Sequence, residues 1–138
     1  MHKSIALWSL AIAILAYLFG IPEAVADETS MTGENEKLQL VKIFFEKVDS
    51  QADIDSKFTY LTNDFVYIHE GYGGEYSRQD LYNGFLRNWK NGNYKDSEPV
   101  KILSTFSGLN MLVIKREPGG TTLFEFEKDK ISRIKEYW

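Results

Sequence analysis

Apolar residues between Glu36 and Ser50 recur at helical spacing. Val41, Phe45 and Val48 are separated by four and three residues, which places them on one face of a helix. This spacing predicts a helix from Glu36 to about Ser50. The apolar stripe is wide, so we expect the helix to pack on a core.

Two more helices are expected. The first is short, with Asp53 as its N-cap and a buried face formed by Ile54, Phe58 and Leu61.

The next helix is marked by a capping box, in which Ser77 is followed three residues later by Asp80. It should begin at Arg78 and stop at the turn-forming residues 91–93. Its apolar positions fall at four-residue intervals, at Leu81, Phe85 and Trp89.

The remaining pattern is β-rich. Residues 64–70 alternate as a strand, and four more strands, separated by short turns, are predicted for residues 100–106, 111–117, 121–127 and 131–138. Strands joined by short turns form an antiparallel meander. Helices followed by strands predict an α+β domain with three helices packed in a strongly curved, mostly antiparallel sheet.

The N-terminus has a different character. Lys3 precedes an almost wholly apolar run, residues 5–19, and Ala24-Val25-Ala26 follows. This order is typical of a secretory signal peptide, so we expect residues 1–26 to be removed and the protein to be periplasmic or secreted. Retention as a membrane anchor is the alternative, although a spanning helix needs about 20 apolar residues. Residues 27–35 are polar and are expected to form a flexible tether before a domain at residues 36–138.

Composition narrows the function classes. The formal net charge of −4 argues against a nucleic-acid partner, which would select a basic surface. The chain has no cysteine, which excludes disulfides, thiolate metal sites and a thiol nucleophile. His69 and Glu70 are adjacent on a predicted strand and point to opposite faces. We therefore expect no metal site and no cofactor.

Three segments together resemble the SnoaL-like and nuclear transport factor 2-like superfamily, to which ketosteroid isomerase belongs. They are the first strand with its approach, residues 60–69, the glycine turn into a capped helix, residues 73–81, and the final hairpin, residues 124–138. With the first helix they cover residues 36–138. The resemblance implies a cone-shaped pocket within a bent sheet. It implies no single activity, because this fold carries isomerases, cyclases, dehydratases and binding proteins.

The resemblance also points to site residues. The general base of ketosteroid isomerase lies five residues after an Asp that begins the first strand, and counting from Asp64 reaches His69. A histidine can act as a base near neutral pH. The isomerase tyrosine corresponds to Phe44 and its protonated Asp to Thr122 or a neighbour, so steroid isomerisation itself is not expected.

Strand parity suggests a partner for this histidine. By analogy with the family, Glu136 on the last strand faces inward and could hydrogen-bond His69, orienting its ring. An apolar or aromatic ligand would suit the expected pocket lining. That lining is Phe44, Tyr67, Trp89, Thr122, Phe124 and Trp138.

Three functions remain open. The first is an exported small-molecule-binding or accessory protein. The second is an isomerase, dehydratase or cyclase that uses His69 as general base on a small hydrophobic substrate. The third is a homodimeric association module, whose interface would include Arg133, Lys135 and Tyr137. An enclosed pocket with His69 bonded to a carboxylate would favour the enzyme.

Overall fold

The computed structural model describes residues 28–138, with side chains from residue 33 onward. The expected signal segment, residues 1–26, lies outside the described residues. The chain divides into two units, Met1–Ser30 and Met31–Trp138, and the following description concerns the second. Within the described residues, no helix is both long and apolar enough to span a bilayer.

Within residues 28–138 there are three helices, as the sequence predicts for this part of the chain. They are α2 (Glu28–Phe45), α3 (Gln51–Thr59) and α4 (Arg78–Lys90). The bounds of α2 differ from the prediction at both ends, because it begins before Glu36 and stops short of Ser50. Residues 28–35, which we expected to be an irregular tether, are therefore helical.

The early end of α2 has a long-range cause. The ammonium group of Lys57, on α3, donates to the carbonyl oxygens of Ile43 at 2.8 Å, Phe44 at 3.1 Å and Glu46 at 2.6 Å. These carbonyls belong to the last turn of α2 and the residue after it, where a helix leaves acceptors without intrahelical partners. A lysine from the next helix thus caps α2.

The helix N-termini follow the capping-box pattern. Ser77 and Asp80 form the predicted box at the start of α4, and Asn91 is its C-cap. The prediction for α3 was wrong in two respects. Leu61, which we expected on its buried face, lies beyond the end of the helix at Thr59. The second error concerns the start of α3. Its N-cap is Ser50, and Asp53 is the third helical residue, whose carboxylate accepts from the Ser50 backbone N–H at 2.7 Å. Ser50 and Asp53 therefore form a second complete capping box.

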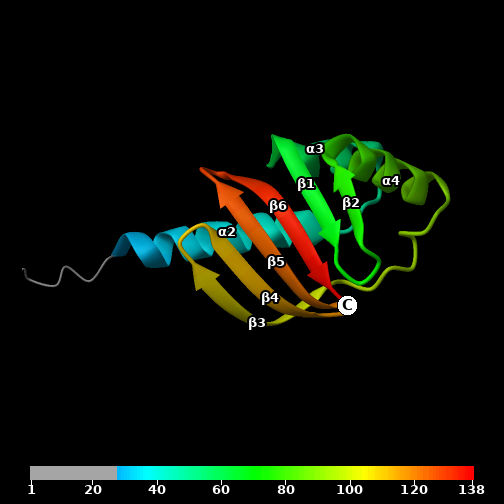
Figure 1. Cartoon of the computed structure of the whole chain (residues 1–138). Coiled ribbons are helices and arrows are strands. Elements are labelled where there is room, and N and C mark those ends of the chain that lie inside the picture. Colours follow the sequence, from blue (N-terminus) through cyan, green and yellow to red (C-terminus); the bar gives the residue numbers. More distant parts are fainter. Residues whose placement is uncertain (1–27) are drawn as a thin grey trace, which may run out of the picture. The chain divides into compact units, whose positions relative to one another are not determined.

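The strands form one six-stranded sheet of order β2-β1-β6-β5-β4-β3 (Figure 1). Neighbouring strands are antiparallel except β1 and β6, which are parallel. Five strands match predicted ones, whereas β2 was expected only as a turn. Their bounds are β1 Leu61–His69, β2 Gly74–Ser77, β3 Lys101–Gly108, β4 Met111–Glu117, β5 Gly120–Glu127 and β6 Lys130–Tyr137.

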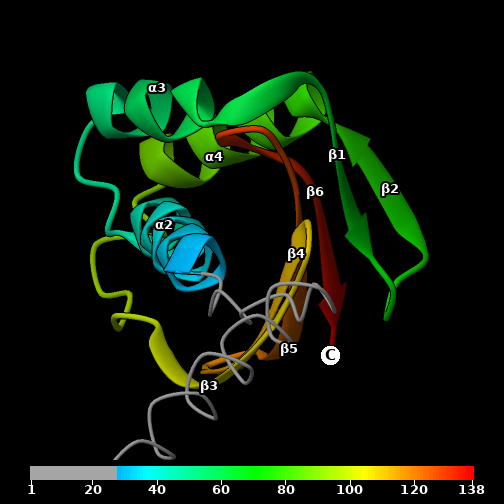
Figure 2. The same ribbon diagram turned by 90° about the vertical axis from the view of Figure 1, so that its left-hand side faces the viewer.

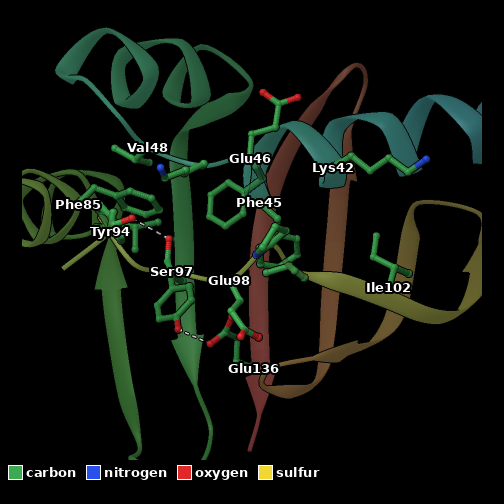
Figure 3. Close-up of a pocket in the computed structure, with 16 residues that line it drawn as sticks. Lys42, Phe45, Glu46, Val48, Phe85, Tyr94, Ser97, Glu98, Ile102 and Glu136 are labelled. Atoms are coloured by element: carbon green, nitrogen blue, oxygen red, sulfur yellow. Dashed lines mark hydrogen bonds between the residues drawn. The ribbon is translucent and has the colours of Figure 1, made fainter. Parts of the chain in front are cut away.

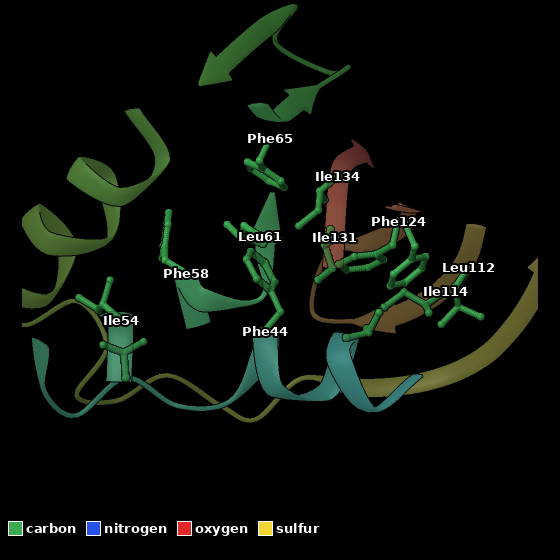
Figure 4. Packing of buried hydrophobic residues seen from close by; sticks show 13 residues of the cluster. Phe44, Ile54, Phe58, Leu61, Phe65, Leu112, Ile114, Phe124, Ile131 and Ile134 are labelled. Atoms are coloured by element: carbon green, nitrogen blue, oxygen red, sulfur yellow. The ribbon is translucent and has the colours of Figure 1, made fainter. Parts of the chain in front are cut away.

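The sheet curves around α2, and α3 and α4 pack at the end formed by β1 and β2 (Figure 2). Buried apolar side chains of α2 and α3 meet those of the concave face (Figure 4), and partly buried apolar residues of α4 pack against this cluster. The Phe44 ring lies edge-on to Phe124 of β5, with ring centroids 6.2 Å apart. Phe58 of α3 contacts Phe85 of α4 in the same way at 5.7 Å. This α+β packing confirms the predicted fold class.

One register change alters the inward face of the last strand. The pairing of β5 with β6 shifts by one residue between Glu125 and Phe126. As a result Ile131 is fully buried, whereas Ser132, which simple alternation would put on the same face as Glu136, is only half-buried. Beyond the shift, Ile134 and Glu136 are buried as predicted.

Candidate functional site

A cavity of about 640 Å³ lies between the C-terminal end of α2, one face of α4, the segment before β3 and the concave face of the sheet (Figure 3). This volume is in the range of small-molecule sites, about 300–1,000 Å³. The wall is rich in aromatic rings, from Phe44, Phe45, Tyr67, Phe85 and Tyr94. Other lining residues carry charge, namely Lys42, Glu46, Lys47, Glu98 and Glu136.

Glu136 is the only buried member of the charged set, with 6% of its surface exposed. Its Oε2 atom accepts from the Tyr67 hydroxyl at 2.7 Å and from the indole N–H of Trp138 at 2.9 Å. Its Oε1 atom accepts from Arg116 Nη2 at 2.8 Å. Three donors thus hold the carboxylate. Tyr67 and Glu136 line the cavity on the side of the sheet, and we call this pair of residues the cavity floor.

Arg116 balances the charge of Glu136 and is itself 8% exposed. Its Nε atom donates to Thr122 at 2.9 Å, and Nη1 donates to the carbonyl oxygen of Pro118. The guanidinium lies over the Phe45 ring, 5.0 Å from its centroid. A buried ion pair needs such further partners, because desolvation offsets much of the attraction between the charges.

The turn between β4 and β5 is shaped to admit this guanidinium. Gly119 has φ +106°, a backbone conformation that residues with a side chain rarely adopt. A Cβ atom at this position would also overlap Nη1 and Cζ of Arg116. Position 119 therefore requires glycine for its backbone angle and for the space that Arg116 occupies.

The Tyr67 hydroxyl remains protonated over the whole ordinary pH range. Burial first, and then the hydrogen bond to Glu136, raise the pKa of Tyr67 far above its usual value. Loss of the phenolic proton would place a second negative charge beside the Glu136 carboxylate. Tyr67 is therefore a fixed hydrogen-bond donor to Glu136, and it is a poor proton donor to anything else.

Of the predicted site residues, the structure brings Phe44, Tyr67 and Glu136 to the cavity. His69 does not line it. His69 and Glu136 are register partners on the parallel strands β1 and β6, and both are buried. Nevertheless the predicted hydrogen bond between them is absent, and the carboxylate accepts from Tyr67, Trp138 and Arg116 instead.

The imidazole of His69 lies instead in an aromatic setting at the end of β1. Its ring centroid is 4.3 Å from that of Tyr72 and 4.6 Å from that of Trp138. Neither ring nitrogen has a hydrogen-bond partner among the described residues. Trp138 donates to Glu136 and also covers His69, so it takes the place that we expected the histidine to occupy.

Four predicted lining residues lie outside the cavity. Thr122 is fully buried beneath Arg116, to which its hydroxyl is bonded. Phe124 is fully buried in the core against Phe44 and Phe45. The Trp89 indole N–H donates to the carbonyl oxygen of Asp49 at 3.2 Å, which ties it to the α2–α3 connection. Trp138 is 55% exposed beyond the end of β6.

Sequence reasoning missed two parts of the site. Arg116 lies on the same face of its strand as the buried Leu112 and Ile114. The alternating pattern of this strand therefore indicated that the Arg116 side chain points inward. The second part is the segment before β3, which contributes Tyr94 and residues 97–100 to the lining. That segment has no apolar periodicity from which its position could be predicted.

No set of three or more His, Cys, Asp or Glu side chains arranged to hold a metal ion occurs within residues 33–138. The buried groups of the floor are already bonded to one another. The site chemistry therefore rests on a shaped apolar cavity and one fixed polar cluster.

The sequence matches no protein-family model and no curated protein. Solved structures are similar in fold. An NTF2-like protein of unknown function from Burkholderia xenovorans has a TM-score of 0.56 at 13% identity, over 75% of this chain and 83% of that one. A proposed polyketide cyclase from Sinorhizobium meliloti has a TM-score of 0.52 at 18% identity, over 72% and 94%.

A proposed ketosteroid isomerase from Kribbella flavida has a TM-score of 0.53 at 10% identity, over 75% of this chain and 78% of that one. These likenesses define the class of fold. The chain has the NTF2-like fold, as the sequence resemblance implied. At such identities the shared property is the fold, which is known to carry more than one activity.

Proposed function

We propose that this protein is an exported binding or accessory protein that holds a small, largely apolar molecule in the cavity of about 640 Å³. The observation that carries the proposal is the combination of this aromatic-rich cavity with a single buried carboxylate whose partners are all internal. Such a site offers shape, apolar contact and one point of orientation, which are the elements of small-molecule recognition.

The same geometry argues against proton-transfer catalysis at the floor. A general base must reach the proton that it removes, within about 3 Å or through one water molecule. His69 is not part of the lining, and both of its ring nitrogens are buried. Glu136 is already bonded to Arg116, Tyr67 and Trp138, so most of its acceptor positions are occupied by donors of the protein itself.

An enzyme that uses His69 remains the rival function, since two similar structures are a proposed cyclase and a proposed isomerase. For His69 to act, the exposed ring of Tyr72 would have to leave it, and a substrate would have to bind outside the cavity. Nothing in the observed geometry favours that arrangement over ligand binding in the cavity.

Native mass spectrometry of the protein from its own cell envelope tests the proposal. We expect a mass that begins at Asp27 and carries a noncovalently bound small molecule, which denaturing conditions release. Leu81 lines the cavity from α4, so Leu81→Trp should occupy part of the volume and abolish retention. The matched control is Leu109→Trp, at a turn residue that is 89% exposed, and it should retain the ligand.

The outcome has separate readings for export and for binding. A mass that includes Met1 would contradict cleavage without affecting the cavity. A cleaved protein that carries no ligand, and that takes up none from a panel of small apolar compounds, would contradict the binding function. Retention of ligand by Leu81→Trp would show that binding occurs elsewhere on the molecule.

A further inference from the structure

We infer that the cavity floor selects ligands that present a hydrogen-bond donor, such as an alcohol or an amine, and disfavours ligands that present a carbonyl oxygen. This inference rests on the proposed binding function and specifies its ligand class. It follows from an inventory of donors and acceptors at Tyr67 and Glu136.

The carboxylate of Glu136 contains only acceptors. Its two oxygens offer about four lone-pair positions, of which Oε2 uses two, for Tyr67 and Trp138, and Oε1 uses one, for Arg116. One acceptor position on Oε1 therefore remains. Since Glu136 lines the cavity, a ligand that reaches it meets an acceptor that carries negative charge.

Tyr67 also presents only acceptor capacity to the cavity. A phenol has one proton, and that of Tyr67 is donated to Glu136 at 2.7 Å. Rotating this proton toward a ligand would leave a buried carboxylate oxygen with one donor fewer, which is costly in a poorly solvated site. The lone pairs of the Tyr67 oxygen are the part that a ligand can use.

The neighbouring donors are directed elsewhere. Arg116 donates to Glu136, Thr122 and Pro118 and does not line the cavity, and neither does Trp138. The ammonium groups of the lining belong to Lys42 and Lys47, both of which are exposed. A ligand acceptor would find a partner at these exposed lysines, whereas its donor would be paired at the floor.

This arrangement is the reverse of a site that stabilises an oxyanion. Such a site needs donors aimed at the position where negative charge develops on a carbonyl oxygen. Here a carbonyl placed at the floor would face the lone pairs of Tyr67 and Glu136 and would be repelled. The same inventory thus explains why donor-bearing ligands are favoured and why carbonyl chemistry at the floor is disfavoured.

Borneol and camphor provide a direct test, because they share one rigid apolar skeleton and differ in having a hydroxyl or a ketone. Isothermal titration calorimetry on the cleaved, folded protein measures both affinities, with bornylamine as a second donor. One additional hydrogen bond, together with the unfavourable placement of the ketone, should make borneol bind roughly tenfold more tightly than camphor. The affinities for borneol and for camphor should both fall in Leu81→Trp and should be unchanged in Leu109→Trp.

Tyr67→Phe provides a second test that changes only one oxygen. If the floor accepts only, this variant exposes another lone pair of Glu136, so borneol keeps its preference and camphor binding does not weaken. If the Tyr67 proton instead turns toward the ligand, camphor loses affinity in Tyr67→Phe. Loss of camphor affinity specifically in this variant would therefore contradict the inference.

The results separate this inference from the proposed function. Equal or tighter binding of camphor in the wild-type protein, with both ligands lost in Leu81→Trp, overturns donor selection and leaves the binding function intact. Failure of all three compounds to bind, up to their solubility limits, overturns the ligand class, while the native spectrum decides the binding function separately. A roughly tenfold preference for borneol that survives in Tyr67→Phe supports both.

Discussion

Lys57 has a structural role that its residue type does not suggest, because a lysine is expected at the surface. Its surface is 3% exposed, and its ammonium group bonds three carbonyl oxygens at the C-terminal end of α2. Burial lowers the pKa of Lys57, whereas the nearby Glu46 and Asp53 carboxylates act in the opposite direction. The cation also meets the negative end of the α2 helix dipole.

Replacing Lys57 with methionine should destabilise the fold, because three buried carbonyls would lose their donor. We expect a loss of about 2–4 kcal/mol in the free energy of unfolding, measured by urea denaturation. The matched control is Lys47→Met, at an exposed lysine whose pair with Asp49 is also exposed. That variant should cost less than about 1 kcal/mol. Equal losses in the two variants would contradict the capping role of Lys57.

The polar cluster of the site was only partly predictable at this scale. Strand alternation combined with the family resemblance predicted Tyr67 and Glu136 as pocket residues, and both line the cavity. It could not show that their side chains bond each other, because 69 positions separate them along the chain. The same is true of Arg116. Its position in the strand pattern indicates burial, but the pattern does not identify its partner, Glu136, which lies 20 positions away. Side-chain pairing across strands depends on the final register.

At the scale of helices and strands, local signals were more informative. The capping box that begins α4 was predicted to the residue, because Ser77 and Asp80 interact within a single turn. The same chemistry at α3 was assigned to the wrong position, since both Ser50 and Asp53 are good caps and the sequence offers no choice between them. The start and end of α2 were missed, the latter because Lys57 determines it from another helix.

The two capping boxes make stability depend on pH. Hydrogen bonds from Ser50 and Ser77, together with backbone N–H groups, lower the pKa of Asp53 and Asp80 below the usual aspartate value. A carboxyl whose folded pKa is lowered contributes stability above its unfolded pKa, and this contribution is lost as the pH falls through the folded value. The effect therefore belongs to acid conditions, below about pH 4.

Asp80→Asn should remove part of this dependence. We expect the difference in melting temperature between the variant and the wild-type protein to be present at neutral pH and to shrink as the pH is lowered below about 4. Thermal unfolding followed by circular dichroism across the pH range measures it. Asp96→Asn, in the segment before β3, serves as the control. A difference between Asp80→Asn and wild type that did not change with pH would argue against the role of the ionised carboxylate.

For the molecule as a whole, the outward face of the sheet suggests a means of assembly. Register places Phe106, Val113, Leu123 and Lys135 in one row across four strands, on the side opposite the buried core. Phe106 is 68% exposed. Arg133 and Glu125 form an ion pair at 3.0 Å on the same face. We propose that a second copy of the chain covers this row, as expected for a homodimer with an aromatic anchor and a polar rim.

Phe106→Glu should convert the dimer to a monomer, because a charge at the centre of an apolar interface would be buried without a partner. Light scattering after size exclusion, at several protein concentrations, measures the mass. Leu109→Glu is the control, since Leu109 is 89% exposed at the turn after β3 and lies outside the row. A monomeric wild-type protein, or a variant that still dimerises, would count against this interface.

The parallel pairing of β1 with β6 has a consequence for the order of events during synthesis. One edge of β1 pairs with β2, which follows it closely in the sequence, whereas its other edge pairs with residues 130–137. Glu136 arrives with the same segment, so Arg116 and Tyr67 have no carboxylate to bond until then. The sheet is therefore incomplete until residues 130–137 have been added to the chain.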